Sequence, residues 1–233
     1  MSANTHEQRI KSSSKPRPQL ADRRRQRART AVIAAARRLL AGGEGESFTM
    51  RDLAEAAGLS LVTPYKHFGS KSGVLRAVVD QSVADITERF KRHPFGNDPL
   101  GRVMTLAEIG ADVLLEDRDV IRPAGRALMI NPSGAPGPTL ADQATQLWQL
   151  AIQADFPFRE EAVVLGAPVL ARQLAVMFRG MMAFWISGEV DDKGFRSGVV
   201  AGATTMILAF AEPRKARAAV QRLIPDGSRI SSD

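Results

Sequence analysis

The chain has 233 residues, a net charge of +7 and no cysteine. Its content of hydrophobic (44%) and charged (24%) residues is typical of a soluble globular protein, and its length suits one large domain or two small ones. The lack of cysteine excludes a disulfide scaffold, thiolate metal sites and a cysteine nucleophile. The three histidines, His6, His67 and His93, lie far apart in sequence. We therefore expect neither a metal site nor a cofactor.

The positive charge is concentrated at the N-terminus. Residues 1–29 carry nine basic and two acidic side chains, whereas the rest of the chain carries 23 of each. Residues 1–22 are rich in Ser, Lys, Pro and Gln and lack apolar periodicity, so they are predicted to form a disordered basic arm. A basic arm favours polyanions, chiefly nucleic acid, although a solvated tail explains the charge equally well. A second disordered tail is expected at 226–233.

No segment is predicted to cross a membrane. The longest uncharged apolar stretch, 197–211, is too short as a helix to span a hydrocarbon layer of ~30 Å. The first thirty residues have no apolar core of the kind found in secretory signals. We expect a soluble, cytoplasmic protein.

The first predicted helix covers 23–41. Its apolar residues share one helical face: Val32, Ala35, Ala36, Leu39 and Leu40. The glycines of segment 41–47 end it. Thr49 and Asp52 then form a Thr-x-x-Asp capping box, which predicts the start of a short second helix.

A third helix is expected to follow closely. Gly58 suits the left-handed residue after the second helix, and Ser60 is an N-cap for a helix over 61–68. Ser70 caps a fourth helix over 71–92. Two helices joined by a short turn that contains glycine are typical of a helix-turn-helix.

The third helix concentrates groups that bind nucleic acid. Thr63, Tyr65, Lys66 and His67 supply hydroxyl, phenol and cationic donors to phosphate oxygens and base edges. The alternative is a polar surface helix whose tyrosine ring packs on a neighbour. Lys71 opposes the dipole of the fourth helix, which suits a bound phosphate but also a solvated lysine.

Everything from Pro99 onward is predicted to be helical, so the protein is expected to be all-α. The predicted helices are 100–116, 118–130, 139–154, 160–188, 195–211 and a short one near 214–223. Arg118, Arg122 and Arg126 recur at helical spacing and either face an acidic ligand or form a solvated surface.

The stretch from about Arg27 to Val79 resembles the DNA-binding domain of TetR-family (tetracycline-repressor-like) transcriptional regulators. The matching pieces are VIAAARRLL (32–40), FTMRDLAEAAGLS (48–60), TPYKHF (63–68) and SKSGVLRAVV (70–79). The resemblance implies a three-helix DNA-binding domain over 23–70, a linking helix over 71–92, and a helical effector-binding and dimerisation domain over 93–225.

The resemblance also implies roles for individual residues. Thr49 and Arg51 would contact the DNA backbone, and Ser60, Leu61, Val62 and Thr63 would face base edges or adjacent phosphates. Tyr65, His67 and Lys71 would grip phosphates, with Lys66 at the edge. Leu61, Val62 and Pro64 depart from the usual family residues, which favours apolar contacts with thymine methyl groups. The basic residues Arg23, Arg24, Arg25 and Arg27 could reach the minor groove.

Two stripes of small residues near the C-terminus suggest a dimer interface. They are Val176, Gly180, Ala183 and Ser187 in one helix, and Gly198, Gly202, Thr205 and Ala209 in the next. Small faces let helix backbones approach closely. The resemblance implies pairing of these two helices with those of a second copy, and close packing inside one subunit is the alternative.

Apolar residues in the same region are candidates for an effector pocket, although each also suits a core position. They are Met104, Met129, Trp148, Phe156, Phe178, Met182 and Trp185.

The sequence thus predicts a homodimeric repressor that binds a near-palindromic double-stranded operator and is released by a small, largely apolar effector. One alternative is a DNA-binding protein without such an effector, controlled by a protein partner or acting architecturally. An enzyme is not expected, because the sequence contains no phosphate loop, metal-ligand spacing or nucleophile elbow.

Overall fold

The computed structural model describes residues 17–44, 47–130 and 138–223, and in this part of the chain it is all-helical apart from one isolated bridge between Phe158 and Ala211. The helices are α1 (Arg17–Leu39), a π-type turn (Leu40–Glu44), α2 (Met50–Ala56), α3 (Val62–Phe68), α4 (Lys71–Arg92), α5 (Pro99–Glu116), α6 (Arg118–Ile130), α7 (Leu140–Ala151), α8 (Glu160–Val163), α9 (Gly166–Ser187), α10 (Asp192–Phe210) and α11 (Pro213–Leu223).

Most predicted helices are confirmed within a few residues, and α4 and α6 have the predicted bounds. Two expectations are wrong. Helix α1 begins at Arg17, so 17–22 are helical rather than part of a disordered arm, and the basic residues Arg23–Arg27 stand on a helix. The helix predicted over 160–188 is divided into α8 and α9, where Gly166 adopts a φ of 66°. Residues 1–16 and 226–233, the other parts of the predicted tails, lie outside the described residues.

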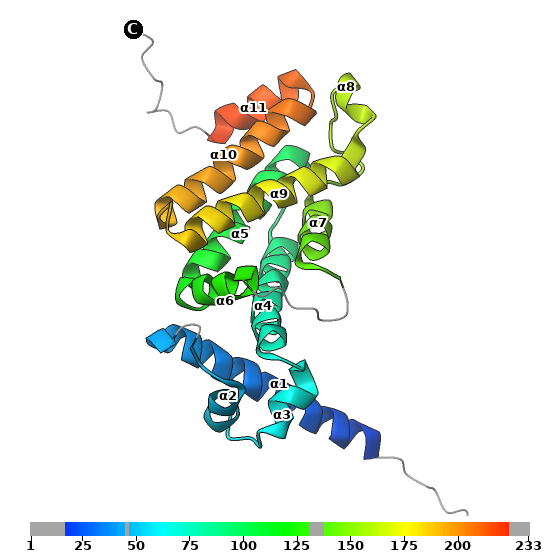
Figure 1. Ribbon diagram of the computed structural model, residues 1–233. Coiled ribbons are helices and arrows are strands. Elements are labelled where there is room, and N and C mark those ends of the chain that lie inside the picture. Colours follow the sequence, from blue (N-terminus) through cyan, green and yellow to red (C-terminus); the bar gives the residue numbers. More distant parts are fainter. Residues whose placement is uncertain (1–16, 45–46, 131–137, 224–233) are drawn as a thin grey trace, which may run out of the picture.

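Helices α1, α2, α3 and the start of α4 form the lower unit of the molecule (Figure 1). Its core combines Val32 and Ala36 of α1 with Leu53 of α2 and Val78 of α4, all of them almost fully buried. This core also includes Val120, Ala124 and Leu128 of α6, so the lower unit packs directly against the upper one.

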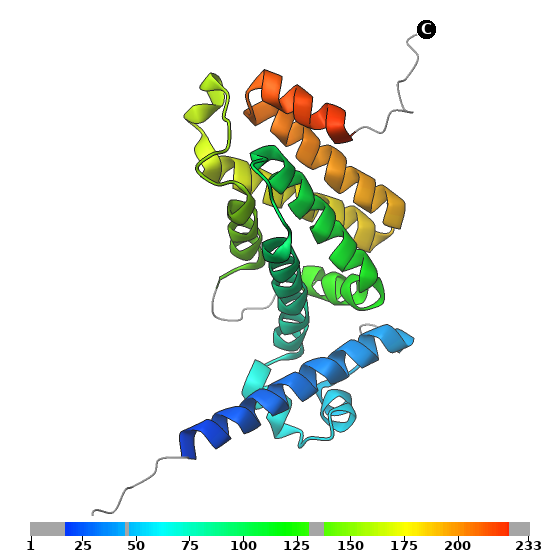
Figure 2. The same ribbon diagram turned by 180° about the vertical axis from the view of Figure 1, so that it is seen from behind.

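Helix α4 runs from the lower unit into the upper one, where α5, α7, α9 and α10 surround a second core (Figures 1 and 2). Its largest fully buried side chains include Trp185 and Phe195, whose rings stack with centroids 4.8 Å apart. Helices α9 and α10 lie side by side and leave one broad face uncovered by the described part of the chain (Figure 1). This α9–α10 face carries exposed apolar side chains, among them Val176, Phe184 and Leu208.

Within the described residues, α9 is the one helix long and apolar enough to cross a membrane. It packs against α6, α7 and α10, and Leu170, Leu174 and Trp185 on its inner side are fully buried. One side of α9 is thus buried in the upper core, and its other side belongs to the α9–α10 face.

Ion pairs join the lower and upper units and the helices of the upper one. Arg37 near the end of α1 donates to Asp117 at the α5–α6 corner (2.7 Å). The three spaced arginines of α6 contact neighbouring elements from the surface, where Arg118 and Arg126 are exposed and Arg122 is half-buried. Arg118 donates to Asp192 (2.8 Å), Arg122 lies 5.5 Å from the ring centroid of Trp185, and Arg126 donates to the carbonyl of Ile186 (3.1 Å).

Candidate nucleic-acid interface and effector cavity

The predicted capping box starts α2. The Thr49 amide donates to the Asp52 carboxylate (2.7 Å), and the Asp52 amide donates to the Thr49 hydroxyl (3.2 Å). These hydrogen bonds, chiefly the one from the Thr49 backbone, lower the pKa of Asp52. Gly58 follows α2 with a φ of 65°, as expected for a left-handed residue at this turn. The turn is therefore fixed locally before α3 begins.

Helix α3 begins one residue later than predicted. Leu61, not Ser60, is its N-cap, and the Ser60 hydroxyl instead lies 3.0 Å from that of Thr63. This shift explains how Pro64 is accommodated. It stands third in the helix, where an amide has no intrahelical partner, so the proline removes no hydrogen bond. Pro64 is buried, unlike its neighbours on this helix.

The start of α3 presents large side chains to solvent. Leu61, Val62 and Tyr65 are 43%, 69% and 50% exposed, and at this spacing they lie next to one another on the surface of the helix. Ser60 and Lys66 are exposed as well, and Thr63 and His67 are half-buried. The short helix thus offers hydroxyl groups, a phenol, a cation and apolar surface on its accessible side.

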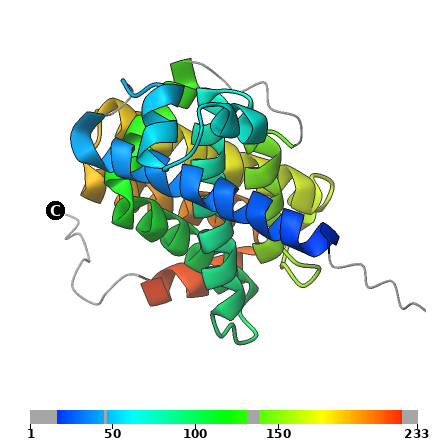
Figure 3. The same ribbon diagram turned by 90° about the horizontal axis from the view of Figure 1, so that it is seen from below.

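The N-terminal half of α1 lies beside α3 (Figure 3). The Arg29 guanidinium sits 4.6 Å from the centroid of the Phe68 ring. Burial, and then the nearby charges of Arg25, Arg29 and Lys66, lower the pKa of His67. The lowered pKa favours the neutral imidazole, which can make a polar contact.

Lys71 has a structural partner that the sequence did not suggest. Its ammonium lies 4.3 Å from the centroid of the Phe48 ring, and it also contributes to the lowered pKa of Asp52. A cation over an aromatic face is attractive, so this contact explains a lysine in the first turn of α4 without any bound anion.

The residues predicted to bind DNA are thus brought together around α3, with the exposed Arg23, Arg24, Arg25 and Arg27 on the neighbouring end of α1. The exposed Thr49 and Arg51 lie at the start of α2, which packs against α3. Arg29, which belongs to the same basic segment, is half-buried and faces the Phe68 ring at the end of α3.

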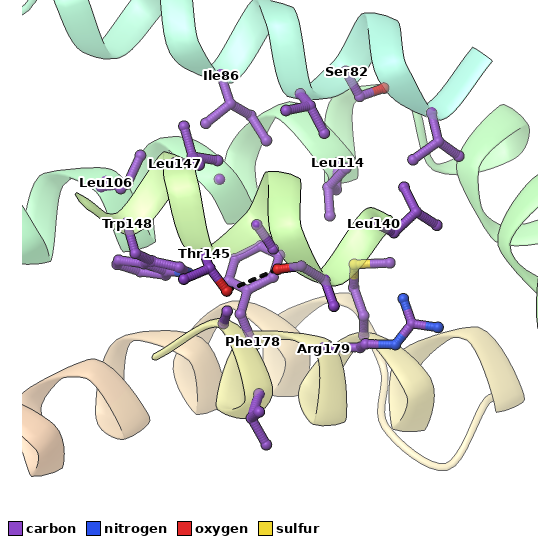
Figure 4. A pocket seen from close by; sticks show the side chains of 18 of the residues that line it. Ser82, Ile86, Leu106, Leu114, Leu140, Thr145, Leu147, Trp148, Phe178 and Arg179 are labelled. Atoms are coloured by element: carbon purple, nitrogen blue, oxygen red, sulfur yellow. Dashed lines mark hydrogen bonds between the residues drawn. The ribbon is translucent and has the colours of Figure 1, made fainter. Parts of the chain in front are cut away.

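A second candidate site is a cavity of about 150 Å³ in the upper unit, enclosed mainly by α4, α5, α7 and α9 (Figure 4). Helix α4 contributes Val79, Ser82, Val83 and Ile86, and Trp148 of α7 and Phe178 of α9 meet edge to face with centroids 6.2 Å apart. The helix that links the two units therefore forms one wall of the cavity.

Three of the predicted effector residues line this cavity, namely Trp148, Phe178 and Met182. The others do not. Met104 is buried in the core, and Trp185 is fully buried with its indole N–H donating to Asp192 (2.8 Å). Met129 is 44% exposed at the end of α6. Phe156, also a candidate, is a core residue beside Phe158.

The two predicted small-residue stripes have different positions. Gly198 and Gly202 of α10 lie against Met181 and Met177 of α9, so these two glycines pack inside the subunit. Val176, Gly180 and Ser187 of α9 are exposed and Ala183 is half-buried, while Thr205 and Ala209 of α10 are exposed. These six residues remain available to a second copy.

Comparison with known proteins agrees with this architecture. Residues 32–78 match the model of the bacterial regulatory proteins of the tetR family. No curated protein sequence matches the chain. Among solved structures, a TetR transcriptional regulator from Rhodococcus sp. RHA1 is similar over 83% of this chain and 100% of its own, with 19% identity and a TM-score of 0.60.

Two further structures share the fold. One, described as the molecular basis for control of antibiotic production by bacterial hormones, has 22% identity and a TM-score of 0.59 over 79% of this chain and 97% of its own. The other is NalD, the secondary repressor of the MexAB-OprM multidrug efflux pump in Pseudomonas aeruginosa, with 18% identity and a TM-score of 0.50 over 82% and 98%.

At these identities the solved structures establish the fold, and the sequence match over α1–α4 establishes the kind of N-terminal domain. Proteins of this family are DNA-binding transcriptional regulators rather than enzymes. Residues 32–78 thus match the N-terminal domain of the tetR family of bacterial regulatory proteins, and the chain as a whole shares the fold of solved TetR-family regulators.

Proposed function

We propose that the protein is a sequence-specific repressor that binds a near-palindromic operator as a homodimer and leaves it when a small, largely apolar effector occupies the cavity beside α4. The observation that carries the DNA-binding part is the exposed side of α3. Leu61, Val62 and Tyr65 are held in solvent by a helix whose other side is anchored in a core. Such a surface is stable only because the fold supports it, and it suits insertion into a major groove.

The α9–α10 face supports the dimer. Val176, Gly180, Phe184, Thr205 and Leu208 are exposed, and none of them is charged. Exposed apolar side chains across two long adjacent helices are costly in water and suit pairing with an identical face. A two-fold dimer would place its two α3 helices in successive major grooves, about 34 Å apart.

Helix α4 supports the coupling between effector and DNA. It carries cavity residues on one stretch and buries Val74 and Val78 in the DNA-binding core on another. A ligand in the cavity can favour one position of α4 over another only through different affinities for the two states. The position that it favours would set a spacing of the α3 helices that does not match the operator.

A DNase footprint on the DNA that flanks the protein's own gene tests this proposal. A protected, near-palindromic block that survives a rise in salt is expected for a specific dimer. Diffuse protection that disappears with salt would leave only non-specific binding by the basic end of α1. If a specific footprint persists with every candidate effector, a regulator controlled by a protein partner becomes the better description.

A further inference from the structure

The charged residues that line the cavity are both arginines. Arg172 and Arg179 lie on α9, two helical turns apart, where α9 borders α7, and among the described residues no aspartate or glutamate lines the cavity. Both arginine side chains are exposed, whereas Trp148 and Ala175 in the same wall are buried. The arginines therefore stand at the solvent side of an otherwise apolar space.

The interior offers almost nothing to a polar ligand. The lining contains two hydroxyl groups, those of Thr145 and Ser82. The Thr145 hydroxyl already donates to the carbonyl of Ala141 in its own helix (2.8 Å). The remaining walls are aliphatic and aromatic. A polar or charged group placed deep in this space would lose its hydration without compensation. The lining therefore selects an apolar body for any ligand.

The carboxylate of Asp142, which lies close to Arg172, already accepts hydrogen bonds within its own helix cap. The Asp142 carboxylate accepts hydrogen bonds from the Thr139 hydroxyl (2.7 Å) and amide (3.0 Å), which cap α7. These bonds lower the pKa of Asp142, with a smaller contribution from Arg172. Arg172 is thus partly balanced by Asp142, which leaves Arg179 as the better anchor for an anion.

The two ends of the cavity differ in chemistry, because one is cationic and the other is apolar. In Figure 4, Arg179 and Trp148 lie on opposite sides of Phe178. A ligand whose anionic group meets Arg179 would extend its apolar part past Phe178 toward Trp148. Guanidinium groups bind carboxylates through paired, charge-assisted hydrogen bonds, which suits this end of the cavity.

We propose that the effector is an amphipathic monocarboxylate, with its carboxylate at Arg179 and Arg172 and its apolar chain in the cavity between α7 and α4. This inference rests on the proposed function, because it names the chemistry of the effector. This inference predicts that cationic ligands do not bind, and that a neutral molecule of the same shape binds more weakly than the acid.

Calorimetric titration of the full chain, without DNA, tests the ligand class. The probes are two matched pairs, decanoate with decan-1-ol and 4-phenylbutanoate with 4-phenylbutan-1-ol, together with decylammonium as the cation. In at least one pair the acid is expected to bind about ten-fold or more tightly than the alcohol, since one charge-assisted contact is worth about that factor. Failure of both acids to bind, or equal or tighter binding by the alcohol or the ammonium, would overturn the proposal.

Three variants test whether the acid binds in this cavity with its carboxylate at Arg179. Arg179→Gln is expected to reduce the affinity for the acid to near that of the alcohol and to leave the alcohol unchanged. Arg214→Gln removes the same charge from an exposed position on α11 and is expected to change neither affinity. Ala144→Phe fills the cavity and should abolish binding of both members of the pair. An acid that binds Arg179→Gln or Ala144→Phe as well as the parent does not occupy this site.

The footprint and the titration can fail independently. The footprint reports on DNA binding, and the titration reports on the ligand class without DNA. A specific footprint combined with no acid binding overturns only the present inference. Acid binding at Arg179 without any footprint overturns the repressor and leaves the ligand class standing.

Discussion

We expect the side chains on α3 to divide into those that contact phosphates and those that contact base edges. The Tyr65 hydroxyl is assigned to a phosphate, so Tyr65→Phe should weaken binding to every DNA sequence by a similar factor. Loss of one hydrogen bond of about 0.5–1.5 kcal/mol corresponds to about two- to ten-fold. Competition titrations with operator and scrambled duplexes measure it. Val62→Ala is the contrasting variant. The Val62 side chain is 69% exposed on this helix, so its removal should change the preference for particular base pairs. A changed sequence preference in Tyr65→Phe would contradict the assignment.

A second residue-scale prediction concerns the buried Arg102. Its guanidinium is paired with Asp155 and also donates to the carbonyl of Ala151 (3.3 Å). Asp155→Asn should lower the free energy of unfolding by about 1–2 kcal/mol at pH 7, less than for a fully buried pair because the Asp155 side chain is 45% exposed. Glu161→Gln, in an exposed pair with Arg159, should change it little.

The contribution of the Arg102–Asp155 pair to the free energy of unfolding should decrease in acid. The hydrogen bond from Arg102 lowers the pKa of Asp155 in the folded state. The pair therefore stabilises the fold fully above the ordinary carboxyl pKa, and the stabilisation is lost as the pH falls through the lowered value. Urea unfolding from pH 7 downward should show the parent and Asp155→Asn converging in acid. A constant difference at all pH values would mean that the charge of Asp155 is not what matters.

Helix boundaries show which features local sequence determines. Helix α4 follows the Ser70 cap as predicted, because the Ser70 hydroxyl accepts from the Gly73 amide (3.1 Å). The division of α8 from α9 was not predicted, although the sequence carries a local signal for it. Gly166 adopts the left-handed conformation at the break, and Pro168 stands in the first turn of α9, a position that helices tolerate. The early start of α1 was not predicted either, although Pro18 stands in its first turn, a position that helices tolerate.

The α9–α10 contact inside the subunit gives an element-scale prediction. A Cβ atom at Gly202 would lie 2.5 Å from the Met177 sulfur and 2.7 Å from its Cγ. Gly202→Val should therefore separate the two helices and cost about 1–3 kcal/mol of unfolding free energy, measured in urea. In a Met177→Ala background the same substitution should cost less, because the opposing side chain is shorter. Equal costs in both backgrounds would show that the two helices do not depend on this contact.

The opposite side of the same two helices should govern assembly. Phe184 is 48% exposed on the α9–α10 face, and Phe184→Glu would place two like charges in a two-fold interface. We expect monomers by light scattering and a weaker operator complex, since one monomer engages only one half-site. Leu20→Glu, at an exposed apolar position on α1, should leave the oligomeric state unchanged. A dimeric Phe184→Glu would require a different interface.

At the scale of the whole molecule, the sequence indicated the fold and the DNA-binding helices better than it indicated the cavity. Most of the predicted DNA-binding residues lie within 49–71, so local spacing was sufficient to group them. The cavity joins α4, α5, α7 and α9, which are separated by loops, and its lining depends on how these helices pack. The sequence pattern therefore did not reveal Arg172 and Arg179, although they share one face of α9. The prediction for Trp185 was wrong for the same reason, since its partners Asp192 and Phe195 belong to the next helix.

The distribution of charge over the molecule leads to a test of the basic end of α1. Arg23, Arg24, Arg25 and Arg27 are exposed on a helix that lies beside α3, so they can reach phosphates next to the base contacts of α3. Replacing all four by glutamine should flatten the dependence of log K on log salt by roughly 0.9 for each phosphate that these arginines neutralise. Glutamine at Arg214, Lys215 and Arg217 of α11, at the other end of the molecule, should leave the slope unchanged. An equal effect of both sets would mean that net charge alone attracts the DNA, because only side chains that meet phosphates release counterions in fixed number.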